Sequence, residues 1–136
     1  MIRLLLIILV FPAFLTAQEA GNRLSLLFMG DVMGHGPQVE GAYDAKTKQY
    51  DYEPVFAKIK HKFAEADFAI ANLEVTLGGK PYKGYPQFSS PDALAVACQN
   101  SGIDVLVTAN NHTCDRGKKG IIRTLDVLDS LKIAHT

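Results

Sequence analysis

Three short apolar segments, each followed directly by polar residues, constrain the fold of this chain more than any other feature. They lie within residues 24–36, 67–79 and 104–117. The third, DVLVTANNHTCDRG, shows the arrangement most clearly, because an expected strand at 105–109 leads into a polar turn. In an open α/β sheet, ligands bind in the crevice outside the carboxyl ends of the strands. We therefore expect the polar residues at the three strand ends to meet in one site.

The order of the expected elements is β-α-β-α-β-α, which predicts an α/β fold with a mainly parallel sheet and right-handed crossovers. The expected strands are 23–29, 68–71 and 105–109, and the expected helices are 53–65, about 91–101 and 121–131. The first strand is nearly all apolar, as in a strand covered on both faces. Residues 37–51 show no clear period and are expected to form a loop or an irregular excursion.

The last residues, 132–136, have the pattern of a chain entering a fourth strand. A sheet of three strands that stops at this point would be unusual for a domain. We therefore expect residues 23–136 to be the N-terminal portion of a longer domain, with some of the site missing.

The middle helix carries clear start and stop signals. Ser90 is expected to cap it, Pro91 to take the first helical position, and Asp92 to favour the positive end of the helix. Gly102 tolerates the left-handed geometry that closes a helix.

The charge balance argues against a nucleic-acid partner. The 136 residues include 14 Lys and Arg and 14 Asp and Glu, so the net charge is zero with neutral histidines. Such a chain has no general attraction for a polyanion. Any anionic substrate must therefore be held by local charges.

The N-terminus reads as a signal for export. A basic residue at position 3, an apolar run from 4 to 15 and small residues at 16–17 form the pattern of a secretory signal peptide over residues 1–17. An uncleaved N-terminal membrane anchor is the alternative. Either reading predicts a periplasmic or extracellular protein.

Two cysteines, Cys98 and Cys114, raise the question of a disulfide. A bond between them would tie the middle helix to the polar turn after the third strand. We favour two free thiols, because a buried cysteine commonly acts as a small hydrophobic residue.

The strand ends supply a set of metal ligands. Asp31, Glu74, Asn111 and His112 offer two carboxylates, an amide oxygen and an imidazole. Such mixed oxygen and nitrogen donors suit Mn, Fe or Zn ions, and a bridging carboxylate could hold two of them. The alternative is that Asp31 and Asn111 are turn formers and helix caps, whose side chains fold back onto the backbone.

Four strings in register give the chain a family resemblance: GDVMGH at 30–35, NLE at 72–74, FSSP at 88–91 and ANNHTCDRG at 109–117. They resemble the bacterial CapA family of poly-γ-glutamate capsule synthesis proteins, over essentially all of the chain after residue 22. That family is similar to the calcineurin-like metallophosphoesterases, whose fold is a four-layered α/β/β/α sandwich with a two-metal centre.

The resemblance also implies roles for the four candidate ligands. Asp31 stands at the metal-binding aspartate of the first strand, Glu74 at the bridging carboxylate of the second, and Asn111 with His112 at the Asn-His pair of the third. Two departures weaken the match to the phosphoesterases. Met33 occupies a position where they have a histidine, and Glu74 replaces their usual aspartate. The histidines that complete their metal centre would come from the other half of the sandwich.

Further candidates surround these ligands. His35 is either a proton donor or extra ligand, or a loop residue without a role, and His112 is the second candidate for catalysis. Asn72 and Asp115 are expected to support the ligands, with a helix cap as the alternative for Asp115. Arg116 either clamps a phosphate or polymer carboxylate or is solvated.

The aromatic residues Tyr82, Tyr85 and Phe88 either line a substrate groove or clamp their loop against the sheet. Tyr85 is the aromatic candidate for substrate binding.

The sequence therefore predicts a CapA-like exported protein that acts in the synthesis or export of a capsule or extracellular polymer of the poly-γ-glutamate type. An anionic polymer or a phosphoester is its expected substrate, and other capsule-synthesis membrane proteins are candidate partners. Two alternatives remain open: a metal-dependent hydrolase of phosphoesters or of the polymer, and a polymer-binding module without catalysis.

Overall fold

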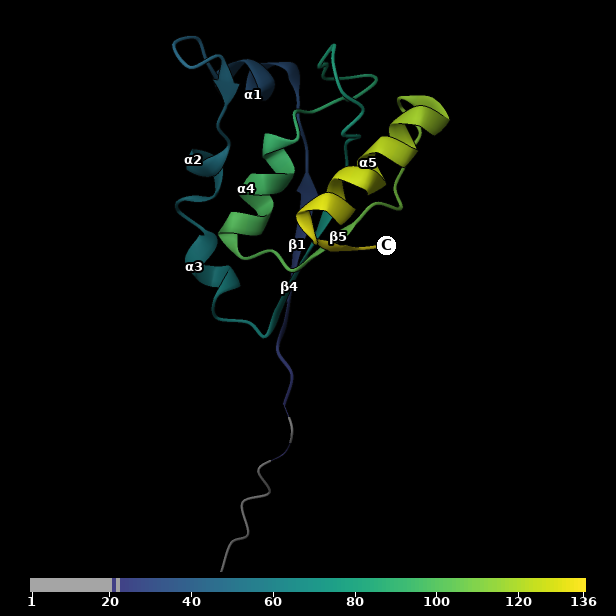
Figure 1. Cartoon of the computed structure of the whole chain (residues 1–136). Coiled ribbons are helices and arrows are strands. Elements are labelled where there is room, and N and C mark those ends of the chain that lie inside the picture. Colours follow the sequence, from purple (N-terminus) through teal and green to yellow (C-terminus); the bar gives the residue numbers. More distant parts are fainter. Residues whose placement is uncertain (1–20, 22) are drawn as a thin grey trace, which may run out of the picture.

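A four-stranded parallel sheet organises the chain, which a computed structural model describes over residues 21 and 23–136 (Figure 1). The strands lie in the order β1-β4-β5-β6, and each neighbouring pair is parallel. Their bounds are β1 (Leu26–Val32), β4 (Phe68–Leu73), β5 (Val105–Val107) and β6 (Ala134–His135). The mainly parallel α/β sheet and the fourth strand are confirmed. The expected signal peptide, residues 1–17, lies outside the described residues.

Five helices and one hairpin connect the strands: α1 (Gly36–Gly41), α2 (Glu53–Phe56), α3 (Lys60–Phe63), α4 (Ala93–Ser101) and α5 (Gly117–Leu131), with β2 (Tyr43–Asp44) antiparallel to β3 (Gln49–Tyr50). Residues 37–51, expected to form a loop, thus hold a helix and a small hairpin. Their elements are too short to produce a detectable hydrophobic period. No helix among the described residues combines the length and apolar character needed to cross a membrane.

The helices α4 and α5 lie on the same face of the sheet (Figure 1). Consecutive strands are neighbours, and right-handed crossovers between such strands place every connecting helix on one side. The packing agrees, since Ala71 of β4 and Leu106 of β5 share one buried cluster with Leu94 of α4 and Leu128 of α5. The core therefore lies between the sheet and a single layer of helices.

The opposite face of the sheet is exposed in the described part of the chain. Phe28 is 72% exposed, Leu26 48% and Phe68 47%. We call these three residues the bare face. Because aligned residues of parallel strands point the same way, the pairing of Leu26 with Phe68 and of Phe28 with Ile70 puts all of them on one side. The expectation that β1 is covered on both faces is therefore wrong for these residues. In the four-layered sandwich of the resemblance, a second sheet packs on this face.

The expected helix 53–65 is two short helices, α2 and α3, joined by a turn. Only Phe56 and Phe63 are buried, whereas Val55 is 59% exposed and Ile59 42% exposed. A helix of this length depends on burial of its apolar face. Since the middle turn buries nothing, the continuous helix is not stabilised there.

The start of α4 differs from the expected one. Its N-cap is Asp92, without a side-chain capping bond, while Ser90 is fully buried and its hydroxyl has no hydrogen-bond partner among the described residues. Ser90 lies two residues before the N-cap and belongs to the preceding loop, where its backbone N–H donates to the carbonyl of Thr76. The stop signal is confirmed: Gly102 closes the helix in the left-handed conformation, with φ at 97°.

The loop 78–91 is held tightly against the start of α1. A Cβ atom at Gly84 would lie 2.4 Å from the backbone nitrogen of Gly36 and 3.0 Å from the carbonyl carbon of His35. Both are backbone atoms that no side-chain rotation can move. The loop can approach α1 this closely only because position 84 is glycine.

Replacing Gly84 with alanine should therefore destabilise the protein by about 1–3 kcal/mol, the usual cost of overpacking. The shift of the urea unfolding midpoint of the full chain measures it. Gly41→Ala is the matched control, because a Cβ there meets nothing within 4 Å. Equal midpoints for the two variants would show that the loop does not pack on α1.

Candidate functional site

The carboxyl ends of β1, β4 and β5 bring three polar clusters together, as their strand-end positions predict. An irregularity between Met29 and Asp31 shifts the register of β1, so that Asp31 pairs with Asn72 of β4. Side chains alternate along a strand, so Asn72 lies on the same side of β4 as Phe68 and Ile70. This is the side of the bare face. Asp31 and Asn72 therefore stand where the bare face reaches the carboxyl edge of the sheet.

The side chain of Asn72 connects these clusters. Its amide nitrogen donates to Oδ1 of Asp31 at 2.8 Å and to Oε2 of Glu74 at 3.1 Å, and its oxygen accepts from Nδ2 of Asn110 at 3.0 Å. Asn110 also donates to the carbonyl of Leu73 at 2.9 Å. Two amides thus join the ends of three strands. Asn110 is not among the candidates from the sequence, although its place just after the third strand is a usable signal.

The two carboxylates at this edge stand close enough to influence each other. Partial burial raises the pKa of Glu74, and a hydrogen bond and the negative charge of Asp31 raise it further, while the nearby imidazole of His112 lowers it. A cation would relieve the repulsion between Asp31 and Glu74. The pair therefore has the electrostatic character of a cation-binding edge.

His112 is oriented by Asp115, one turn further along the chain. Nδ1 of His112 lies 2.8 Å from Oδ2 of Asp115, and this oxygen also accepts the backbone N–H of Phe88 at 2.7 Å. A carboxylate can only accept, so the proton resides on Nδ1 of the imidazole. This leaves Nε2 as the nitrogen that can meet a ligand.

Phe88 stands between the two candidate catalytic histidines. Its ring is fully buried and meets His35 edge-on at a centroid distance of 5.0 Å and His112 at 4.6 Å. Phe88 of the FSSP string therefore packs against both histidines. For Phe88, this contact supports the interpretation that the loop aromatics hold the loop against the sheet. The sequence pattern puts Phe88 in the loop and contains no signal that connects it with either histidine.

The other candidates are more dispersed. Asn111 is exposed on the turn, outside the amide network of Asn72 and Asn110 in the described residues. His35 is also exposed, and its backbone N–H donates to Oε1 of Gln38 at the start of α1. Tyr85 is 73% exposed.

Arg116 crosses from α5 to the loop. Its guanidinium donates to the carbonyl of Pro81 at 3.1 Å. A Cβ atom at Gly78 or at Gly120 would overlap its stem. This packing fixes the loop to the start of α5.

A complete metal centre is not formed by the described residues, where no three His, Cys, Asp or Glu side chains gather closely enough to hold an ion. The donors that do gather, Asp31 and Glu74 with His112 nearby, have the chemistry that a divalent ion requires. The described residues thus fit one side of a metal site.

Both cysteines are free thiols, as favoured from the sequence. Cys98 is buried on α4 and Cys114 is exposed in the site turn. Burial raises the pKa of Cys98 to about 12, so it stays protonated.

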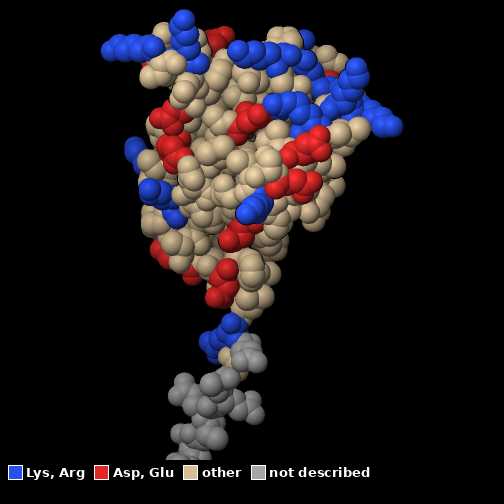
Figure 2. All heavy atoms as spheres, in the orientation of Figure 1, with Lys and Arg blue, Asp and Glu red and all other residues tan. Residues whose placement is uncertain are grey.

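Lysines surround the carboxyl edge of the sheet. Figure 2 shows Lys and Arg side chains gathered at the end of the molecule that carries α1, the hairpin and the start of α5. The lysine rim consists of five exposed lysines of the hairpin, the loop 78–91 and the start of α5: Lys46, Lys48, Lys83, Lys118 and Lys119. A chain of zero net charge therefore gathers positive side chains near the two carboxylates of its candidate site.

Replacing Asp115 with alanine should cost about 1.5–3 kcal/mol of unfolding free energy, because the N–H of Phe88 and the imidazole of His112 both lose a charged acceptor. Asp115→Asn keeps one accepting oxygen and should lose less. Urea unfolding of the full chain at pH 7 compares the three proteins. If both variants are as stable as the parent, Asp115 does not hold the loop and the turn together.

A protein family, but no individual curated protein, matches this chain. A search of curated proteins finds no match. The family model described as "Bacterial capsule synthesis protein PGA_cap" matches residues 25–136, which is most of the chain and every element of the sheet. The chain therefore belongs to this family of bacterial capsule synthesis proteins, as its motif resemblance to the CapA family implies.

Proposed function

We propose that this protein is exported and handles an anionic polymer of the poly-γ-glutamate type during its synthesis or export. Family membership relates the chain to capsule synthesis. The observation that carries the finer proposal is the lysine rim around the carboxyl edge of the sheet. Its charges are placed where a polyanion would pass the candidate site, although the whole chain has no net charge. Capsule-synthesis membrane proteins are the partners that such a role requires.

We further propose that Asp31, Glu74, Asn111 and His112 hold one or two divalent ions of Mn, Fe or Zn. A bound ion would supply Lewis acidity and lower the pKa of a coordinated water. The amide of Asn72 positions the two carboxylates, and Asp115 keeps the proton of His112 on Nδ1. These contacts hold the donors in fixed orientations before an ion arrives.

A metal-dependent hydrolase of phosphoesters or of the polymer is the second candidate. The pairing of His112 with Asp115 favours it, because an imidazole oriented by a carboxylate can move a proton at Nε2. His35 on the other side of Phe88 would be a second proton donor. Met33, in place of the phosphoesterase histidine, favours instead a polymer-binding role without catalysis.

Metal content tests the site. Elemental mass spectrometry on the full chain, after loading with Mn²⁺ or Zn²⁺, should find about one to two ions per chain. His112→Ala should lose them, together with the metal-dependent rise in melting temperature.

His61→Ala is the matched control, because His61 is an exposed residue of α3. It should bind as much metal as the parent. Equal metal content in the parent and in His112→Ala would show that His112 is not a ligand. No metal in the parent would exclude the metal site and favour polymer binding without catalysis.

Charge reversal tests the polymer. The double variant Lys118→Glu with Lys119→Glu should bind poly-γ-glutamate roughly tenfold more weakly in low salt, with the difference shrinking as the salt concentration rises. Lys58→Glu with Lys60→Glu changes the charge equally, outside the lysine rim. Equal losses in the two double variants would mean that net charge, and not the rim, attracts the polymer.

A further inference from the structure

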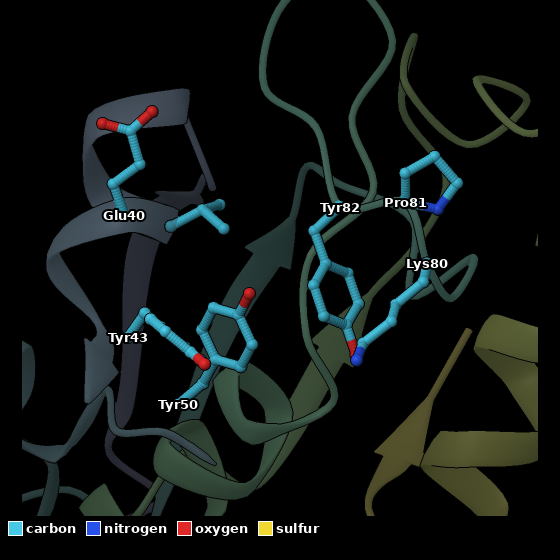
Figure 3. Close-up of a pocket in the computed structure, with 7 residues that line it drawn as sticks. Glu40, Tyr43, Tyr50, Lys80, Pro81 and Tyr82 are labelled. Atoms are coloured by element: carbon cyan, nitrogen blue, oxygen red, sulfur yellow. The ribbon is translucent and has the colours of Figure 1, made fainter. Parts of the chain in front are cut away.

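An open pocket of about 680 Å³ lies beside the candidate site, between α1, the hairpin and the loop 78–91 (Figure 3). Its walls are formed by Val39, Glu40, Tyr43, Tyr50, Lys80, Pro81 and Tyr82. We call it the tyrosine pocket. It contains none of the candidate metal ligands, and its size is in the range of small-molecule sites.

Three aromatic rings form one wall of this pocket, and the wall is angled, not flat, because each ring is steeply inclined to the next. The ring centroids of Tyr43 and Tyr50 are 5.1 Å apart at 49°, and those of Tyr50 and Tyr82 are 5.2 Å apart at 86°. At these distances the rings touch, so no cation fits between them as it would in an aromatic cage. Burial raises the pKa of Tyr82, which keeps its phenol protonated as a donor at neutral pH. The wall therefore offers apolar surface edged by phenol hydroxyls.

The pocket carries one charge of each sign. Glu40 and the hairpin tyrosines stand on one side, and Lys80, Pro81 and Tyr82 on the other (Figure 3). A polyanion attracted by Lys80 would be repelled by Glu40, so the charges of the pocket do not select the polymer that the lysine rim attracts. A neutral ligand rich in hydroxyl groups satisfies both, since a carboxylate accepts from hydroxyls and an ammonium donates to their oxygens.

We propose that the tyrosine pocket binds a neutral pyranose unit of a cell-envelope or capsular glycan. The C–H face of a pyranose ring is apolar and packs on an aromatic wall, while its hydroxyls lie around the rim of the ring. Tyr43, Tyr50 and Tyr82 provide the wall, and Glu40 and Lys80 bind the hydroxyls. This inference goes beyond the proposed function, because it gives the protein a second ligand next to the anionic polymer.

The pocket is tied to the site by the same loop. Its wall residues Lys80 to Tyr82 belong to the loop 78–91, and Arg116 at the start of α5 holds the carbonyl of Pro81. Glu40 lies on α1, the helix that His35 caps. A glycan seated in the tyrosine pocket would therefore lie against the two segments that also border the histidines.

Calorimetric titration of the full chain with the neutral trisaccharides chitotriose, cellotriose and maltotriose tests the proposal. At least one should bind, and Tyr43→Ala should weaken that binding about tenfold, because Tyr43 lines the pocket and is 44% exposed, so its ring is accessible to a ligand. Tyr43→Phe keeps the ring and should bind within about threefold of the parent. Glu40→Gln, which keeps shape but loses charge, should also weaken binding.

Lys80→Ala and Lys58→Ala form the matched lysine pair, since Lys58 is exposed and does not line the pocket. The first should weaken trisaccharide binding and the second should not. Chemical shift changes in the ¹H–¹⁵N spectrum on adding the trisaccharide should include residues 40, 43, 50 and 80–82. These variants keep the buried core intact, and unchanged spectra elsewhere confirm that they fold.

Three results would overturn the proposal: no trisaccharide binds, binding survives Tyr43→Ala unchanged, or oligo-γ-glutamate shifts the same residues and loses affinity in Lys80→Ala. Repeating the titration with a chelator separates this proposal from the metal site, because sugar binding at the tyrosine pocket needs no ion. A negative metal or polymer experiment therefore does not affect the conclusion from the trisaccharide titration, and a negative trisaccharide titration does not affect the metal or polymer proposals.

Discussion

The side-chain amide of Asn72 is the contact on which the candidate site depends. It donates to Asp31 and Glu74 and accepts from Asn110, so that one residue of β4 fixes the ends of β1 and β5. Two carboxylates at one edge repel each other, and a neutral amide that donates to both lowers this cost without neutralising either. The negative charge that a cation needs is therefore retained, while the geometry stays fixed.

The sequence predicted most of the sheet because its strands are apolar runs that end in polar clusters. It missed the short elements, α1 and the β2–β3 hairpin, since six residues or fewer do not show a period. It also predicted one helix at 53–65, where Val55 and Ile59 stay largely exposed. Periodicity reveals an apolar face, whereas only the tertiary structure shows whether that face is buried.

The sequence indicated which polar side chains come near one another, but not their contacts. Polar types at strand ends pointed to Asp31, Glu74 and His112, which the structure places close together, while their role as metal ligands stays a prediction. The pairing of His112 with Asp115 follows a local spacing of three residues, which a sequence can suggest. The contact of Phe88 with both histidines joins segments 53 and 24 residues apart. No local pattern encodes such a contact, because it depends on how the loop 78–91 packs on α1.

The bare face bears on why the described residues would supply only part of the proposed metal site. Asp31 and Asn72 lie at the carboxyl edge of the same side of the sheet as the exposed Phe28 and Phe68. In the four-layered sandwich that the resemblance implies, the second sheet covers this side and brings the remaining ligands with it. Burying Phe28 and Phe68 and completing the ion's coordination would then be one event. Metal binding and packing of the two sheets would stabilise each other, because each requires the same approach of the same surfaces.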